Sequence, residues 1–191
     1  MFRHLSASMA LESAYAGKWA RAAGHTNATV ELHNSTGASG TINSSKGWYD
    51  AGDYGRYIVN SGITTYTLLS LYEHFPEFFK TAKWNIPADG TLPDLLAEIK
   101  YNLDWMLTMQ ANDGSVYHKL TSLAFPGDVM PAQDNAKLYV IGKSAEAALD
   151  FAGVMANYKL NTQNLQTLFF VLRLSLHHTL ELLIFLAFHL F

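Results

Sequence analysis

The feature that most limits the folds open to this chain is a stripe of apolar side chains between residues 92 and 109. The stripe recurs at steps of three and four residues, and Asp94, Glu98 and Lys100 lie off it. This period predicts an amphipathic helix, which must bury one face against another element. Pro93 suits its first turn, because the N–H that proline lacks is not needed there. The stripe consists of Leu92, Leu95, Leu96, Ile99, Leu103 and Met106.

Three further segments are expected to be helical: residues 9–23, 54–74 and 143–158. Asp53 stands where it can cap the second of them. Residues 33–47 are rich in Ser, Thr, Asn and Gly and are typical of a loop with a short hairpin, and residues 115–120 suit a short extended stretch. Helices joined by long polar loops predict an all-α fold that carries its site on the loops.

The composition excludes several classes of function. With 13 basic and 16 acidic residues, the net charge is -3, and no basic excess is available to neutralise the phosphates of a nucleic acid. The chain has no cysteine, so disulfides, thiolate zinc sites and cysteine nucleophiles are excluded. Its eight histidines include no HExxH-type pair. We therefore expect no metal site and no cofactor.

The last stretch of the chain differs in character from the rest. From Leu165 onward it is dense in Leu and Phe, with Arg173 and Glu181 as its charged residues. Both charges fall inside any window of about 20 residues, the length that a membrane span needs, so membrane association through 165–191 is not expected. The alternatives are a buried or interface helix, or a non-native tail produced by a frameshift or truncation. The N-terminus lacks a long apolar run, so no signal peptide is expected in this chain.

The segment richest in potential chemistry is residues 47–60, with the sequence GWYDAGDYGRYIVN. Asp50 and Asp53 flank two small residues, which permit a tight turn and the close approach of a ligand. Aromatic side chains, among them Tyr49, surround the acids. Paired carboxylates beside aromatic rings suit sugar chemistry, since one acid polarises water while rings stack on pyranose faces. The alternative is structural: Asp53 as a helix cap and Asp50 as a turn residue.

A second candidate segment, residues 113–119 and the leucine that follows, reads DGSVYHKL. His118 and Lys119 are expected to project from this segment, where the histidine could hydrogen-bond sugar hydroxyls. Its alternative is an ordinary surface or packed histidine.

These segments together resemble glycoside hydrolase family 9, the cellulases and related β-glucanases. GWYDAGDYGRYIVN is similar to the DAGD signature of that family, LPDLLAEIKYNLDWMLTMQ to its next helix, and DGSVYHKL to its substrate-contacting loop. The resemblance implies part of an (α/α)6 barrel and inverting hydrolysis of β-1,4-glucosidic bonds. It further implies Asp53 as the catalytic base, Asp50 as a second acid that holds the attacking water, and His118 as a sugar contact. With Tyr49 and Lys119 added from the residues themselves, the expected partner is a β-glucan oligo- or polysaccharide.

The chain also departs from the family pattern. The general acid of the family is a glutamate near the end of a much longer chain, and these 191 residues offer no counterpart to it. The later histidine and arginine sugar contacts and the calcium site also lack counterparts. We therefore expect residues 1–160 to be the N-terminal portion of such a catalytic domain and 161–191 to be an apolar tail outside the family pattern or a packed helix. The chain is then an incomplete hydrolase with little or no activity, and the intact relative an extracellular or periplasmic enzyme.

Two other classes of function remain open at this level. A non-catalytic carbohydrate-binding module would use the aromatic residues and His118 only as a binding surface. A helical interaction or membrane-associated protein would depend on residues 165–191.

Overall fold

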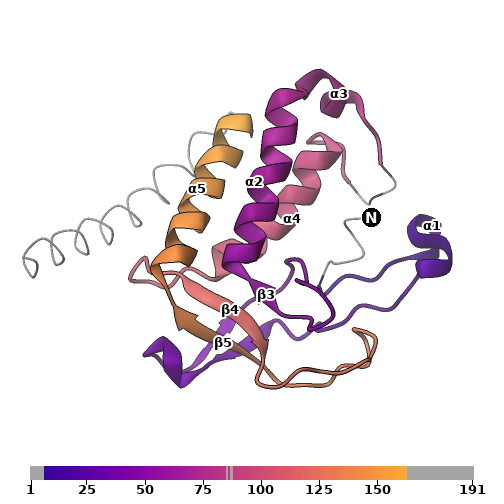
Figure 1. Ribbon diagram of the computed structural model, residues 1–191. Helices are drawn as coiled ribbons and strands as arrows, with labels where there is room; N and C mark the ends of the chain where they lie inside the picture. The colour runs from indigo at the N-terminus through magenta and orange to yellow at the C-terminus, as the bar shows by residue number, and fades with distance from the viewer. Residues whose placement is uncertain (1–6, 85, 87, 163–191) are drawn as a thin grey trace, which may run out of the picture.

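The computed structural model describes residues 7–84, 86 and 88–162. Three long helices lie side by side above a β-sheet, with α2 between the other two (Figure 1). They are α2 (Ile58–His74), α4 (Asp94–Thr108) and α5 (Ala145–Thr162). The shorter helical segments are α1 (Ser13–Ala16), η2 (Gly17–Trp19), η3 (Asn34–Thr36) and α3 (Pro76–Thr81).

The expectation of an all-α fold is wrong, because the described residues contain a mixed five-stranded sheet, with strand order β2-β1-β5-β4-β3. Strands β1 and β5 are parallel, and the other neighbouring pairs are antiparallel. The partial (α/α)6 barrel of helical hairpins joined by loops is therefore not the architecture seen here. The strands are β1 (Thr29–Leu32), β2 (Thr41–Asn43), β3 (Arg56–Tyr57), β4 (Tyr117–Ser122) and β5 (Leu138–Lys143).

Two of the predicted helices were wrong in extent. Residues 9–23 form only the short α1 and η2 within an arm closed by a bridge between Leu11 and Arg21. Gly17 interrupts the helix with a φ of 55°, a conformation that glycine adopts without a steric cost. The helix predicted to start at residue 54 starts at Ile58, since the two residues before it pair with β4. The extended stretch at β4 and helices α4 and α5 match expectation, whereas the hairpin expected within residues 33–47 starts earlier, because its first strand β1 ends at Leu32.

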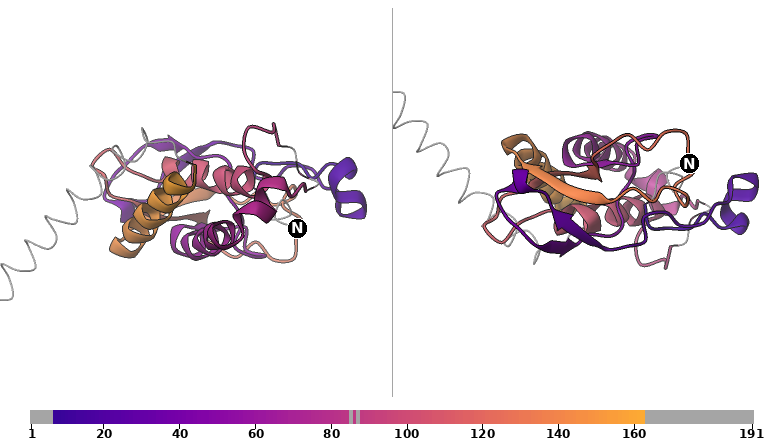
Figure 2. Two further views of the ribbon diagram at one scale, coloured as in Figure 1. Left: turned by 90° about the horizontal axis from the view of Figure 1, so that it is seen from above. Right: turned by 90° about the horizontal axis from the view of Figure 1, so that it is seen from below.

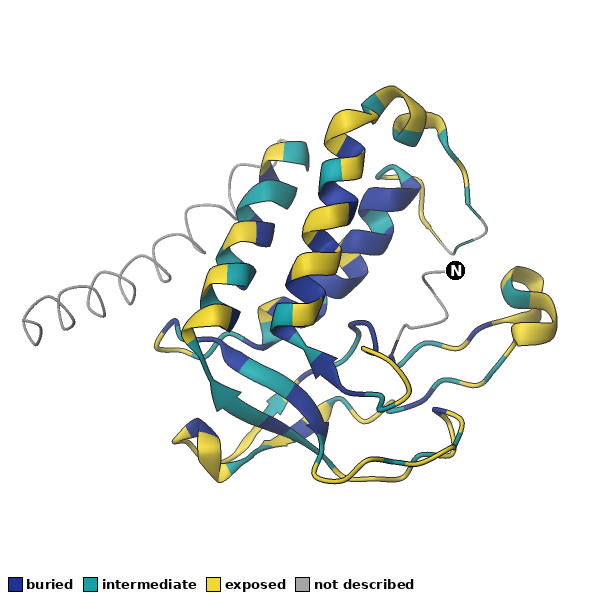
Figure 3. Ribbon diagram, in the orientation of Figure 1, coloured by how far each residue is buried: buried dark blue, intermediate teal, exposed yellow. Residues whose placement is uncertain are grey.

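Helix α4 forms the centre of the core, and most of its ribbon has the colour of buried residues (Figure 3). Five of the six stripe residues are buried: Leu95, Leu96, Ile99, Leu103 and Met106. Leu92 precedes the helix and packs at the edge of the core. Burial extends beyond the stripe on one side of α4, because Glu98 and Asn102 are fully buried, whereas Lys100 and Leu107 are exposed. This helix meets α2 on one side and bonds Trp48, in the chain before β3, on another. Seen from below, the strands lie in front of the helices (Figure 2).

No helix among the described residues is long and apolar enough to cross a membrane. Most of the segment 161–191 lies outside the described residues, and the expectations placed on 165–191 lie wholly outside them.

The packing of α4 yields a stability prediction. Ile99 is fully buried, so Ile99→Ala should lower the free energy of unfolding by about 2–5 kcal/mol through lost burial and the cavity left behind. Leu107 on the same helix is 39% exposed, and Leu107→Ala should cost less than about 1 kcal/mol. Urea unfolding followed by circular dichroism measures both. Equal costs at the two positions would contradict this placement of α4.

Candidate active site

The acidic loop, residues 46–56, is anchored at its start by helix α4. The backbone N–H of Trp48 donates to Asn102 at 3.1 Å, and its indole N–H donates to Glu98 at 3.0 Å. Gly47 has a φ of 80° and lies so close to Trp105 that an added Cβ would sit 2.6 Å from its ring. Only glycine meets both conditions, so the loop begins at one place on the core.

The far end of the acidic loop is closed by hydrogen bonds to its beginning. The N–H of Asp50 donates to the carbonyl of Gly55 at 2.8 Å, and Arg56 Nη1 donates to the carbonyl of Lys46 at 2.6 Å. Burial lowers the pKa of the Arg56 guanidinium to about 10. Tyr54 is held at a φ of 53°, which is strained for a residue with a side chain. A closed loop with backbone strain is typical of functional sites that must hold their groups in place.

The structural alternative, in which Asp53 caps the helix, is wrong. One of its carboxylate oxygens accepts from the Gly55 N–H at 3.1 Å, and the other accepts from the Tyr57 hydroxyl at 2.6 Å. Helix α2 instead has Tyr57 at its N-cap position, without a side-chain cap. A carboxylate offers about four lone-pair sites, so the half-buried Asp53 keeps room to accept from water.

Asp50 lies on the exposed rim of a small hollow. Its Oδ1 accepts from Asn60 Nδ2 at 2.7 Å, and among the described residues no donor reaches its other oxygen. The hollow of about 70 Å³ has room for a few water molecules but not for a sugar ring, so a pyranose would have to lie outside it. It is lined by Trp48, Tyr49, Asp50, Tyr57, Asn60, Ser61 and Thr64.

Tyr57 joins the two acids, since it lines the hollow beside Asp50 and donates its hydroxyl to Asp53. Burial, and next the hydrogen bond to Asp53, raises the pKa of Tyr57 to about 12. The sequence reasoning missed both Tyr57 and Asn60. Their positions just after the DAGD string, at the start of a predicted helix, were the available signal.

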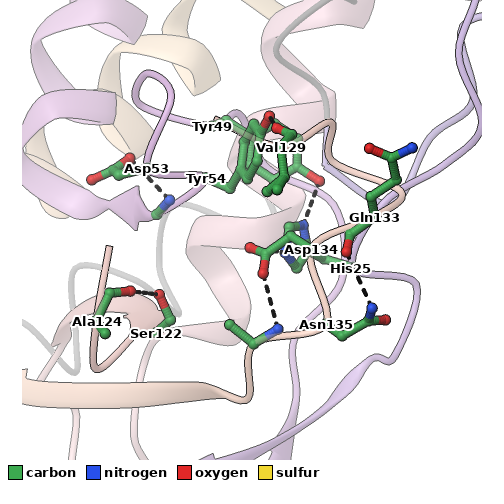
Figure 4. Close-up of polar contacts among 12 residues, drawn as sticks. His25, Tyr49, Asp53, Tyr54, Ser122, Ala124, Val129, Gln133, Asp134 and Asn135 are labelled. Carbon is green, nitrogen blue, oxygen red and sulfur yellow. Dashed lines mark hydrogen bonds and ion pairs between the residues drawn. The ribbon is translucent and has the colours of Figure 1, made fainter. Parts of the chain in front are cut away.

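Tyr49 does not present its hydroxyl to the hollow. The side chain is buried, and its hydroxyl lies 2.8 Å from Nδ1 of His25, which in turn contacts Asp134 (Figure 4). Burial raises the pKa of Tyr49 to about 12. Tyr49 thus lines the hollow without presenting its hydroxyl there. His25 and Asp134 were also missed, since neither lies near the acidic loop in the sequence.

The two candidate residues of strand β4 are separated by the strand itself. Lys119 Nζ lies 5.6 Å from the centre of the Tyr57 ring, on the same side as Asp53 and its hydrogen-bond partner. Neighbouring residues of a strand point to opposite faces, and His118 hydrogen-bonds Ser144 at 2.9 Å, before α5. The structure thus brings Lys119 to the ring of Tyr57, the residue that bonds Asp53, and directs His118 to Ser144. No cluster of three or more potential metal ligands occurs within residues 7–84, 86 and 88–162.

Comparison with protein families and known proteins gives consistent matches. The model of glycosyl hydrolase family 9 matches residues 6–168. A xyloglucan-specific endo-β-1,4-glucanase from Bacteroides ovatus is 50% identical over 162 residues, which are 81% of this chain and 28% of that protein. Endoglucanase D of Acetivibrio thermocellus is 40% identical over 116 residues, 59% of this chain and 19% of that protein.

Solved structures of the same family also superpose on this chain. A Bacteroides ovatus family 9 structure superposes with a TM-score of 0.83 at 44% identity, covering 92% of this chain and 34% of that one. The family 9 endoglucanase J30 gives a TM-score of 0.83 at 31% identity, covering 94% of this chain and 36% of that one. The chain thus spans between about a fifth and about a third of the length of these relatives.

The contact between Asp53 and Tyr57 yields a titration prediction. Asp53→Asn should lower the pKa of Tyr57 by about one unit, because the negative charge that opposes tyrosinate formation is removed while burial remains. The matched Asp50→Asn should have a smaller effect, since Asp50 is the weakest of the causes acting on Tyr57. NMR titration of ¹³Cζ-labelled tyrosine resolves this site. An unchanged Tyr57 midpoint in the Asp53 variant would show that the contact is absent in solution.

Proposed function

Because the chain belongs to glycosyl hydrolase family 9, we propose that its acidic loop forms the water-activating half of a site for inverting hydrolysis of β-1,4-glucans. The observation that carries the proposal is the pair of acids on one strained loop. Asp50 borders a hollow sized for water, and Asp53 is oriented by two hydrogen bonds.

In this proposal Asp53 is the general base. Its two present partners fix the plane of the carboxylate while leaving lone pairs for water. A nearby water that donates to Asp53 becomes more nucleophilic, because its proton passes to the carboxylate as the oxygen attacks the anomeric carbon. Asp50, held by Asn60, accepts a hydrogen bond from the second O–H of that water and so fixes the direction in which the water attacks.

The other candidate residues take unequal parts in the proposal. Lys119, beside the Tyr57 ring, is placed to donate to sugar hydroxyls near Asp53. Tyr49 lines the hollow, and its hydroxyl is directed into the protein interior, to His25. His118 would contact sugar only if the glycan extends past β4 to the side of Ser144.

The similarity to a xyloglucan-specific endo-β-1,4-glucanase supports internal cleavage of a β-1,4-glucan backbone, with xyloglucan as the first polymer to test. A polymeric substrate of this kind supports an extracellular or periplasmic location. We also propose that family sequence makes up residues 1–160, the N-terminal portion of the catalytic domain. The family match runs on to residue 168, beyond that boundary and beyond the last described residue.

A hydrolysis assay tests the proposal. The purified chain should release little reducing sugar from xyloglucan, because the glutamate that protonates the leaving oxygen has no counterpart here, and general acid catalysis is worth about 10²–10⁴-fold. A 2,4-dinitrophenyl β-cello-oligosaccharide removes this need, since its leaving group departs as a stable phenolate. Its hydrolysis should therefore exceed that of xyloglucan and depend on Asp53.

The control for this assay is Asp89→Asn, which removes an exposed carboxylate that accepts hydrogen bonds from Thr91 and lies outside both candidate segments. Asp53→Asn should abolish release of dinitrophenol, and Asp89→Asn should preserve it. Release that persists unchanged in the Asp53 variant would exclude Asp53 as the base. Robust cleavage of xyloglucan by the chain alone would instead show that the lack of a general acid does not limit its activity.

A further inference from the structure

Three side chains from three distant segments form a buried hydrogen-bonded chain behind the acidic loop (Figure 4). The hydroxyl of Tyr49 lies 2.8 Å from His25 Nδ1, and His25 Nε2 lies 3.1 Å from Asp134 Oδ2. The side chains of His25 and Asp134 are only 3% and 5% exposed. None of these contacts is used in the chemistry proposed for Asp53.

The chemistry of the partners determines where the protons lie. A carboxylate can only accept hydrogen bonds, so His25 Nε2 carries a proton and donates a hydrogen bond to Asp134. In the neutral imidazole Nδ1 is then unprotonated and accepts from the Tyr49 hydroxyl. Both ring nitrogens are thus satisfied when His25 is neutral.

The surroundings favour this neutral form. Burial lowers the pKa of His25, the hydrogen bond and the charge of Asp134 oppose that change, and the nearby Arg56 and Arg21 lower the pKa further. The other group facing the ring is the neutral Tyr54, whose ring centre lies 5.8 Å away. His25 and Asp134 are also among the residues that line a hollow of about 460 Å³.

The chain of hydrogen bonds acts on both ends of the acidic loop. Tyr49 directly precedes Asp50 in the sequence. At the other end Tyr54, next to Asp53, donates its hydroxyl to the carbonyl of Val129, in the segment that leads to Asp134 (Figure 4). The rings of Tyr49 and Tyr54 lie 5.1 Å apart. The segment 129–134 therefore ties together the backbone on either side of the two acids.

We propose that His25 and Asp134 are positioning residues for the acidic loop, joining Tyr49 to the segment 129–134 and so holding Asp50 and Asp53 in place. Their relevance to catalysis rests on the function proposed for the two acids. The hydrogen bonds that join Tyr49, His25 and Asp134, here called the clamp, are a property of the folded chain. A second consequence concerns acid. Protonated His25 has a donor at both nitrogens, so it no longer accepts the Tyr49 hydroxyl.

The direction of the pH effect follows from linkage. The pKa of His25 in the folded chain is below its ordinary value, so the unfolded state takes up a proton first as the pH falls. The stability that the clamp contributes is present above the ordinary histidine pKa of about 6.5 and is lost as the pH falls from there toward the lowered value.

Amide hydrogen exchange of the full chain tests the clamp. The reporter is the Asp50 N–H, which bonds the Gly55 carbonyl, and the reference is the buried Ile99 amide in α4. His25→Ala and Asp134→Ala should each speed exchange at Asp50 roughly tenfold relative to Ile99, the value of one hydrogen bond. The control His33→Ala, which removes a ring bonded only to nearby Ser35, should change neither rate.

A conservative variant distinguishes positioning from general loss of structure. Asp134→Asn keeps an oxygen that accepts from His25 Nε2, so it should restore most of the protection at Asp50. The ¹⁵N resonances of the imidazole should show His25 protonated at Nε2 alone near neutral pH. Tyr49→Phe should shift the Nδ1 resonance of His25 and leave that of His33 unchanged.

The outcomes separate the clamp from the proposed function. Faster exchange at Asp50 in the Ala variants, with recovery in Asp134→Asn, supports positioning even if no glycan is ever hydrolysed. Wild-type exchange at Asp50 in His25→Ala, or a His25 ring protonated at Nδ1, overturns the clamp even if Asp53 proves to be the base.

Discussion

The structure depends above all on the contact between helix α4 and the chain around Trp48. This helix is buried on nearly every face, and it uses its polar residues Glu98 and Asn102 to bind the backbone and indole of Trp48. A buried polar group that loses its partner costs about 1–3 kcal/mol, so these contacts specify one register between helix and loop. The position of the acids follows from that register.

From this anchor the acidic loop is built by constraints that reinforce one another. Gly47 lies against Trp105, Arg56 holds the carbonyl of Lys46, and Tyr54 stays in a strained conformation. Strain of this kind persists only where neighbouring contacts oppose its release. The result is a pair of carboxylates whose hydrogen bonds leave lone pairs free for water. The proposed activation of water for attack on a glycosidic bond requires such free lone pairs.

The fold was only partly predictable because the sequence carries local periods more strongly than long-range pairing. The stripe on α4 and the alanine-rich α5 follow from their period, since a helix closes its own hydrogen bonds. The sheet was missed because β1 and β5 pair across more than a hundred residues, as Glu31 and Tyr139 do, and no local pattern specifies such a partner. The prediction of a helix over 9–23 was wrong, because Gly17 interrupts the helix and Leu11 pairs with Arg21 in a bridge, and neither feature is visible in the apolar period.

The sequence alone determined the family and predicted the two candidate acids and their loop, because a short motif such as DAGD places both acids within four consecutive residues. Only the tertiary structure decided which side chains serve those acids. It placed Tyr57 on Asp53 and Lys119 beside Tyr57, turned His118 to the other side of β4, and buried the Tyr49 hydroxyl against His25. The physical reason is that strand pairing and burial assign each side chain to a face, and both depend on partners far away in the chain.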